Sequence, residues 1–165
     1  MNIRYLISGL VLSFAIAGTL TAQGTRMLRH PTVSRDLVAF AYAGDLWAVS
    51  RNGGTARRLT ATPGVEGDPY FSPDGSRIAF SATVAGNTDV YIMSVSGGDP
   101  KRLTYSPVED HVRGWTPDGQ RILFSSVRGD APLESHWRLW TISVNGGMPE
   151  PLQLSRAFTG PPIWD

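Results

Sequence analysis

Two short segments of the chain concentrate the side chains that could form a polar binding site. They hold four carboxylates, one imidazole and one guanidinium: Glu66 and Asp68, then Glu109, Asp110, His111 and Arg113. Carboxylates and imidazoles bind cations and metal ions, and all three groups hydrogen-bond to peptides. We predict that these residues contribute to a binding surface, with ordinary solvated loop charges as the alternative. Because adjacent residues of one loop rarely converge on a single ion, we predict no metal site.

The common catalytic and cofactor motifs are absent from the sequence. No two glycines are separated by one residue, so the glycine-rich phosphate fingerprints are missing, and no serine lies in a nucleophile elbow. The chain has no cysteine, and its histidines (His30, His111 and His136) lie outside any zinc-protease pattern. The Asp residues of the Ser-Pro-Asp-Gly and Thr-Pro-Asp-Gly segments are better explained as turn residues. We therefore predict no catalytic residue and no cofactor in this segment.

The charge balance excludes one class of partner. The 165 residues include 15 Lys and Arg against 14 Asp and Glu, which argues against nucleic-acid binding driven by bulk charge. The 41% of apolar residues is enough to build a core for about one domain. We therefore expect no nucleic-acid partner.

The first 22 residues are typical of a secretory signal peptide. Arg4 precedes an apolar run over residues 5–17, and small residues follow up to Ala22. The run is shorter than the ~20 residues that a transmembrane helix needs, which disfavours the alternative of an uncleaved anchor. We predict cleavage, export to a bacterial periplasm, and no membrane span in the mature chain.

The rest of the chain, residues 23–165, is built from internal repeats. Residues 71–80 match residues 115–124, and residues 89–98 match residues 138–147, while an earlier copy of the second motif covers residues 45–54. These landmarks define three copies (31–60, 71–104 and 115–153), and a fourth begins at Trp164. Because four landmarks keep their order in every copy, chance similarity within a β-sandwich is the weaker explanation.

Each copy predicts four short strands separated by turns. In the second copy the expected strands are residues 68–71, 77–81, 89–95 and 101–105, with the third apolar on both faces. Four strands in about 40–45 residues are typical of a β-propeller blade, and stacked blades bury both sheet faces. Closed propellers have 4–8 blades. The sequence therefore predicts an all-β, incomplete propeller of about three four-stranded blades, with the rest of the propeller supplied by a longer parent polypeptide.

The blade topology predicts where the candidate residues lie. In a four-stranded antiparallel blade, the connection between the second and third strands lies on the same face as the connection to the next blade. Glu66, Asp68 and residues 109–113 fall in or beside the connections between blades. Because binding residues favour loops on a rigid scaffold, we expect contacts on this face or at the channel mouth it surrounds.

Several motifs together resemble the start of tricorn-type proteases. They are residues 27–34, 38–47, 53–60, 86–91 and 114–119, with the Asp-Leu-Trp of residues 45–47 more specific than the repeat core. The resemblance covers about residues 26–153. It implies a six-bladed propeller, then a seven-bladed propeller, a PDZ domain and serine-protease domains, in a homo-oligomer whose propellers guide peptides. No residue of this chain matches the family's catalytic positions.

The function that we predict is therefore non-catalytic. The chain is expected to be the exported propeller segment of a tricorn-like serine peptidase, guiding peptide access and oligomer packing. The first alternative is a periplasmic protein-binding propeller of the Tol-system type, and the second is a propeller fused to another hydrolase. Fold-level analogy does not separate these three.

Overall fold

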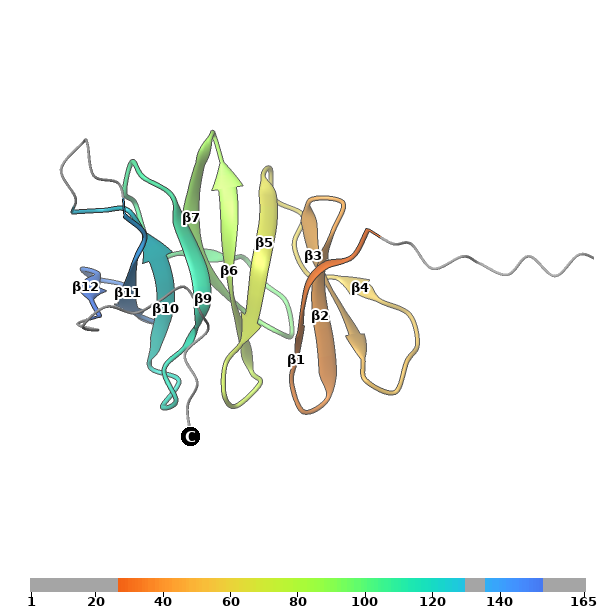
Figure 1. Ribbon diagram of the computed structural model, residues 1–165. Coiled ribbons are helices and arrows are strands. Elements are labelled where there is room, and N and C mark those ends of the chain that lie inside the picture. The colour runs from red at the N-terminus through yellow and green to blue at the C-terminus, as the bar shows by residue number, and fades with distance from the viewer. Residues whose placement is uncertain (1–26, 130–135, 153–165) are drawn as a thin grey trace, which may run out of the picture.

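The computed structural model describes residues 27–129 and 136–152 of the chain. These residues form twelve strands in three four-stranded antiparallel sheets, which stand side by side like the blades of a fan (Figure 1). The all-β fold and the three-bladed, incomplete propeller predicted from the repeats are confirmed. The predicted signal peptide and the fourth repeat at Trp164 lie outside the described residues.

The strands of each blade pair in chain order. Blade 1 contains β1 (Arg29–Val33), β2 (Leu37–Tyr42), β3 (Asp45–Ser50) and β4 (Arg57–Arg58). Blade 2 contains β5 (Val65–Phe71), β6 (Arg77–Val84), β7 (Asn87–Ser94) and β8 (Lys101–Arg102). Blade 3 contains β9 (Asp110–Trp115), β10 (Arg121–Ser126), β11 (Arg138–Ser143) and β12 (Glu150–Pro151).

The core consists of two apolar layers, one on each side of blade 2. Ile78 and Phe80 of β6 face the layer shared with blade 1, as the strand alternation predicts. Val90 and Ile92 of β7 face the layer shared with blade 3. Side chains alternate across a strand, so a sheet packed on both faces must be apolar on both. This explains the nearly continuous apolar run of β7.

The central strands of blade 2 are longer than the repeat pattern predicted. β6 and β7 pair as far as Val84 and Asn87, across a turn at Ala85 and Gly86 whose φ angles are 52° and 85°. Two successive positive φ angles give the tight hairpin whose twist matches the flanking strands, so the pairing continues to the turn. The last strand is shorter than expected because the Thr104 hydroxyl, rather than a backbone carbonyl, accepts the hydrogen bond from the Val90 amide.

The Ser-Pro-Asp-Gly segment forms a turn. The Gly75 amide donates to the Ser72 carbonyl, and Asp74 accepts from both the Ser72 hydroxyl and the Ser76 amide. These hydrogen bonds, that from Ser72 first, lower the pKa of Asp74 to about 2. The carboxylate is held by its own turn, so a structural role explains it.

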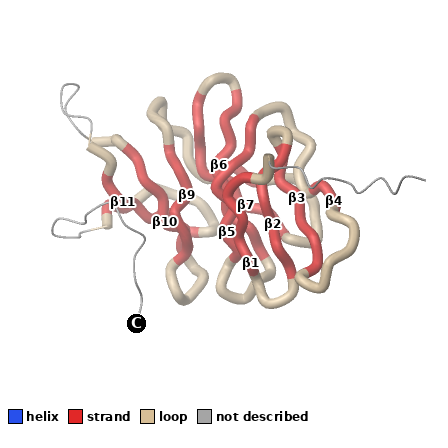
Figure 2. The backbone as a smooth tube through the Cα atoms, turned by 45° about the vertical axis from the view of Figure 1, so that its right-hand side comes forward, coloured by secondary structure: helices blue, strands red, loops and turns tan. Residues whose placement is uncertain are grey.

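The connections separate onto two faces of the blades. The β5–β6 and β7–β8 turns lie at one end of the sheets, and the β6–β7 turn and the connections between blades lie at the other (Figure 2). The first strands β1, β5 and β9 contact one another in succession. They therefore form the inner edge that surrounds the axis in a propeller. Within the described residues, no helix is long and apolar enough to cross a membrane.

Candidate functional site

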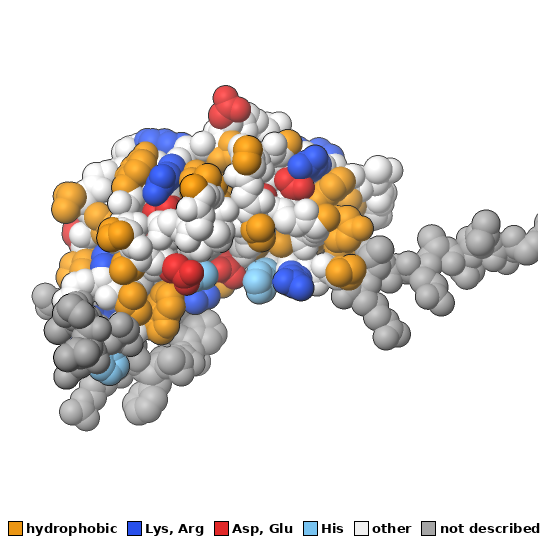
Figure 3. All heavy atoms as spheres, turned by 90° about the horizontal axis from the view of Figure 1, so that it is seen from above, with side chains coloured by type: hydrophobic (Ala, Val, Ile, Leu, Met, Phe, Trp, Pro, Cys, Tyr) orange, Lys and Arg blue, Asp and Glu red, His pale blue; other side chains and the backbone are white. Residues whose placement is uncertain are grey.

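The face that carries the connections between blades contains a pocket of about 410 Å³ between blades 1 and 2. Figure 3 shows this face, with histidine, acidic and basic side chains together along the edge toward the viewer of Figure 1. The pocket has an apolar side that includes Met27, Tyr42 and Val65. Its polar side is formed by Glu66, Asp68, His30, His111, Ser81, Thr83 and Thr88. A pocket of this volume accommodates a side chain or a small ligand.

Asp68 is the centre of a polar cluster that joins all three blades. Its Oδ1 lies 3.3 Å from Nδ1 of His30 on β1, and its Oδ2 lies 3.4 Å from Nδ1 of His111 on β9. The hydroxyl of Ser81 on β6 donates to Oδ2 over 3.2 Å and accepts a hydrogen bond from the Val112 amide. We call His30, Asp68, Ser81, Glu109 and His111 the rim cluster. Three of its members, His30, Asp68 and His111, lie on the successive inner strands β1, β5 and β9, so ionisable groups gather at one point of the inner edge.

A repeated backbone irregularity positions two members of the rim cluster. His30 and Asp68 both have a φ of 47°, and each precedes a proline. The strand register shifts at both places, since a proline has no amide hydrogen for the ladder. Left-handed conformations are uncommon outside glycine, although Asp and His adopt them more readily than most residues. Such strained positions are frequent at functional sites, which marks this bulge as a candidate.

His111 lies between two carboxylates. Its Nε2 is 3.3 Å from Oε2 of Glu109, and its ring packs edge-on against Trp137 with 5.5 Å between ring centres. The hydrogen bond to Asp68, more than that to Glu109, raises the pKa of His111 against the opposing effect of burial. Burial would raise the pKa of Asp68, but His111, the charge of His30, Ser81 and Arg113 together lower it. When His111 is protonated, its imidazolium therefore lies between the carboxylates of Asp68 and Glu109.

The Asp68→Asn variant is expected to lower the pKa of His111, measured by NMR titration of the imidazole. A raised pKa in the folded state stabilises the fold fully below the unfolded pKa of about 6.5, and this stabilisation is lost as the pH rises through the folded pKa. The variant should therefore flatten the dependence of stability on pH above about 6.5. Asp74→Asn, on the opposite face, is the control. An unchanged His111 pKa in Asp68→Asn would contradict the assignment.

Glu66 is almost fully buried at the side of the pocket. Only 2% of the residue is exposed, and its carboxylate accepts hydrogen bonds from the hydroxyls of Thr60 (3.3 Å) and Thr62 (2.8 Å). Burial is the main cause that raises the pKa of Glu66, and the nearby charge of Asp45 adds to it. Within the described ranges Glu66 forms no ion pair, although buried carboxylates are usually paired.

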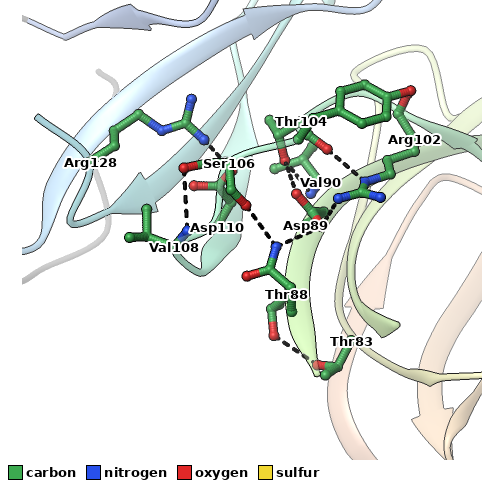
Figure 4. A network of polar contacts seen from close by, with 12 residues as sticks. Thr83, Thr88, Asp89, Val90, Arg102, Thr104, Ser106, Val108, Asp110 and Arg128 are labelled. Carbon is green, nitrogen blue, oxygen red and sulfur yellow. Dashed lines mark hydrogen bonds and ion pairs between the residues drawn. The ribbon is translucent and has the colours of Figure 1, made fainter. Parts of the chain in front are cut away.

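Asp110 is a structural residue of blade 3. It is fully buried and forms an ion pair with Arg128, as the close view shows (Figure 4). The guanidinium carbon of Arg128 lies 4.9 Å from the Phe124 ring centre and 5.5 Å from the Trp140 ring centre. Asp110 therefore does not join the pocket, and its role in the fold is to pair with Arg128.

The six residues predicted from the sequence thus separate in the structure. Glu66, Asp68 and His111 border the pocket, and the exposed Glu109 joins it through His111. Arg113 donates from Nε to the Ser125 hydroxyl over 3.0 Å, and its charge helps to lower the pKa of Asp68. A binding role for this set stays a prediction. No group of three His, Cys, Asp or Glu residues among the described residues is arranged to hold a metal ion.

Sequence reasoning missed four residues that matter here: His30, Ser81, Arg128 and Trp137. One signal was present, because His30-Pro31 and Asp68-Pro69 stand three residues before the last residue of their strands. The contact of His111 with Trp137 had no sequence signal. It joins His111 on β9 to the residue just before β11 through packing alone.

Three four-stranded blades with their first strands inward define this chain as part of a β-propeller. The family model described as the tricorn protease N-terminal beta propeller domain matches residues 25–161. The chain belongs to this family, which confirms the resemblance drawn from its repeats.

Individual relatives agree with this assignment. The putative tricorn protease homolog 2 of Streptomyces coelicolor is 45% identical over 56 residues, covering 33% of this chain and 5% of that protein. Tricorn protease homolog 1 of the same organism is 40% identical over 63 residues, covering 38% and 6%. The matched segments are thus a small part of these relatives.

Solved structures show the same fold. The crystal structure of the tricorn protease superposes with a TM-score of 0.67 at 26% identity, covering 76% of this chain and 13% of that one. TolB from Acinetobacter baumannii gives a TM-score of 0.66 at 25% identity, covering 79% and 33%. The chain is a propeller segment of the tricorn type, and the TolB likeness reflects the shared propeller fold.

Proposed function

We propose that this chain is the exported propeller segment of a longer, tricorn-like serine-type peptidase and guides peptides at its inner edge. The observation that carries the proposal is the rim cluster beside a pocket of about 410 Å³, on the strands that surround the propeller axis. Family membership supports the peptidase context. The pattern of residues 1–22 supports a cleaved signal peptide and a periplasmic location. Packing within a homo-oligomer belongs to the same proposal.

Obstruction of the pocket tests this function in the full-length polypeptide. Gly67 borders the pocket, and a Cβ added there would meet only the His30 ring at 3.7 Å, so Gly67→Trp places an indole in the opening. We expect kcat/KM for peptides of about ten residues to fall at least fivefold. The hydrolysis of a single-residue chromogenic substrate, blocked by a serine-directed inhibitor, should stay within twofold.

The matched control is Ser96→Trp, an exposed position on the opposite face. It should change the rate of hydrolysis of neither the long peptides nor the single-residue substrate. Equal loss for short and long substrates in Gly67→Trp would point to general damage and contradict a passage role. The absence of inhibitor-sensitive hydrolysis in the full-length polypeptide would contradict the peptidase context.

A second candidate function is a protein-binding propeller, because TolB structures superpose on most of this chain. In that case the full-length protein would retain a partner protein from the envelope fraction, Gly67→Trp would release it, and no peptide hydrolysis would accompany binding. The native mass of the polypeptide, read with an antibody to this segment, separates the two. A catalytic region requires a mass several times 17.9 kDa.

A further inference from the structure

The repeat places a buried carboxylate at the same position in blades 2 and 3. Glu66 pairs with Ala82 in the β5–β6 ladder, and Asp110 pairs with Ser126 in the β9–β10 ladder. Each pair of equivalent residues is 44 positions apart, the same offset that relates the strand aromatics Phe71 and Trp115. Both carboxylates are at least 98% buried. In both blades the buried carboxylate therefore requires a nearby cation or hydrogen-bond donors to offset its charge.

Blade 3 meets this requirement with its own cation. Arg128 pairs with Asp110, and its Nε donates to the Ser126 hydroxyl over 3.2 Å. The guanidinium lies against two aromatic rings, which favour a cation over their faces. The arrangement is a complete guanidinium site made from one carboxylate, one hydroxyl and aromatic surfaces.

Blade 2 lacks both of the corresponding groups. Forty-four positions before Arg128 and Ser126 stand Val84 and Ala82, so neither the guanidinium nor the hydroxyl is present. Glu66 keeps only the Thr60 and Thr62 hydroxyls as hydrogen-bond partners and has no ion-pair partner in the described ranges. A buried carboxylate without a counter-ion is costly unless a cation arrives or the group is protonated.

The space beside Glu66 is the pocket between blades 1 and 2. The pocket borders Glu66, Asp68 and Thr83, with the Tyr42 ring among its apolar walls. Asp68 supplies a second carboxylate at the inner edge of the same pocket, and its pKa is lowered, so it is ionised. Arg29 also borders the pocket, but its side chain is exposed at the end of β1. His30 and His111 also border the pocket and both pair with Asp68, which leaves Glu66 as the lining carboxylate without an ion pair in the described ranges, beside an apolar wall.

We propose that the pocket between blades 1 and 2 binds the guanidinium or ammonium group of a basic peptide side chain, with Glu66 as its principal carboxylate partner. That the ligand is a peptide rests on the proposed function, whereas the cationic group follows from the repeat comparison. Burial raises the pKa of Glu66, and a bound cation favours its ionised form. Binding should therefore weaken as the pH falls and Glu66 becomes protonated.

Calorimetric titration with two matched probes tests the charge requirement. The probes are acetyl-Gly-Arg-Gly amide and acetyl-Gly-citrulline-Gly amide, which are nearly isosteric and differ in charge. At pH 7.5 we expect the arginine probe to bind at least tenfold more tightly. Glu66→Gln keeps the size of the side chain and should reduce this preference to twofold or less. Asp99→Asn, an exposed carboxylate change on the opposite face, should keep the preference.

Transfer of the blade 3 arrangement provides an independent test. The double variant Ala82→Ser/Val84→Arg supplies blade 2 with its own guanidinium and hydroxyl, and it should abolish binding of the arginine probe without lowering the melting temperature. Equal binding of the arginine and citrulline probes to the protein without substitutions would overturn the proposal. So would unchanged arginine binding in both Glu66→Gln and the double variant.

The two proposals fail in different ways. If Gly67→Trp impairs the hydrolysis of long peptides while the parent chain shows no preference for arginine over citrulline, the passage role stands and the cation site does not. If the arginine preference is present and depends on Glu66, but Gly67→Trp leaves the hydrolysis of long peptides unchanged, the cation site stands and the passage role does not.

Discussion

Arg128→Met is expected to lower the free energy of unfolding by about 3–5 kcal/mol, the usual cost of leaving one member of a buried ion pair without its partner. Asp110 is fully buried, and the Arg128 side chain is only 15% exposed, so water cannot replace the lost guanidinium. One oxygen of Asp110, Oδ1, already lacks a hydrogen-bond partner. The variant would leave both carboxylate oxygens in that state. Urea unfolding followed by circular dichroism measures the difference.

Two further variants show whether the charge itself causes the loss. Asp110→Asn combined with Arg128→Met removes both charges and should recover more than half of the lost stability. Arg58→Met removes an exposed partner of Asp45, whose ion pair has a separation of 2.8 Å, and should cost about 1 kcal/mol or less. Similar losses in Arg58→Met and Arg128→Met would show that burial does not determine the strength of these pairs.

Phe80→Ala is expected to lower the free energy of unfolding by about 3–5 kcal/mol, because the cavity it leaves adds to the lost transfer free energy. Phe80 is 1% exposed within the layer between blades 1 and 2, and it stacks on Tyr91 with 5.7 Å between ring centres. It also lies on the strand opposite the bulge at Asp68 and Pro69. Loss of the ring should therefore disturb the rim cluster as well as the core.

Two readouts separate these effects of Phe80→Ala. The midpoint of urea unfolding reports the core, and the NMR pKa of His111 reports the rim cluster. Met148→Ala, at a position 86% exposed, should change the free energy of unfolding by less than about 0.5 kcal/mol and leave the pKa unchanged. A cost below about 1 kcal/mol for Phe80→Ala would contradict close packing between the first two blades.

Most of the fold could be predicted from the sequence because its determinants are local. The Ser-Pro-Asp-Gly turn is built by residues 72–76 among themselves, so the same residue types form it wherever they recur. The alternation of Ile78 and Phe80 fixes which face of β6 is buried. Strand ends were less predictable. The positive φ angles of Ala85 and Gly86 extend the β6–β7 hairpin, and alanine is not a residue that signals such a turn.

The candidate site was predictable only in part. The face on which Glu66, Asp68 and His111 lie follows from the order of strands in a blade, and the structure places all three at one pocket. The separation of Asp110 from them did not follow from its neighbours in sequence. Asp110 is adjacent to His111, yet the two side chains point to opposite faces of β9, one toward Arg128 and one toward the rim.

The sequence by itself determined the repeat, the four strands of each blade and the family, since these depend on residue types at fixed spacing along one chain. Only the tertiary structure decided that His30, Asp68 and His111 meet, and that Glu66, unlike Asp110, forms no ion pair among the residues that the structure describes. Those relations join three blades through packing of one sheet against the next. The distance between two blades at a given residue is set by the whole buried layer between them, and no local pattern encodes it.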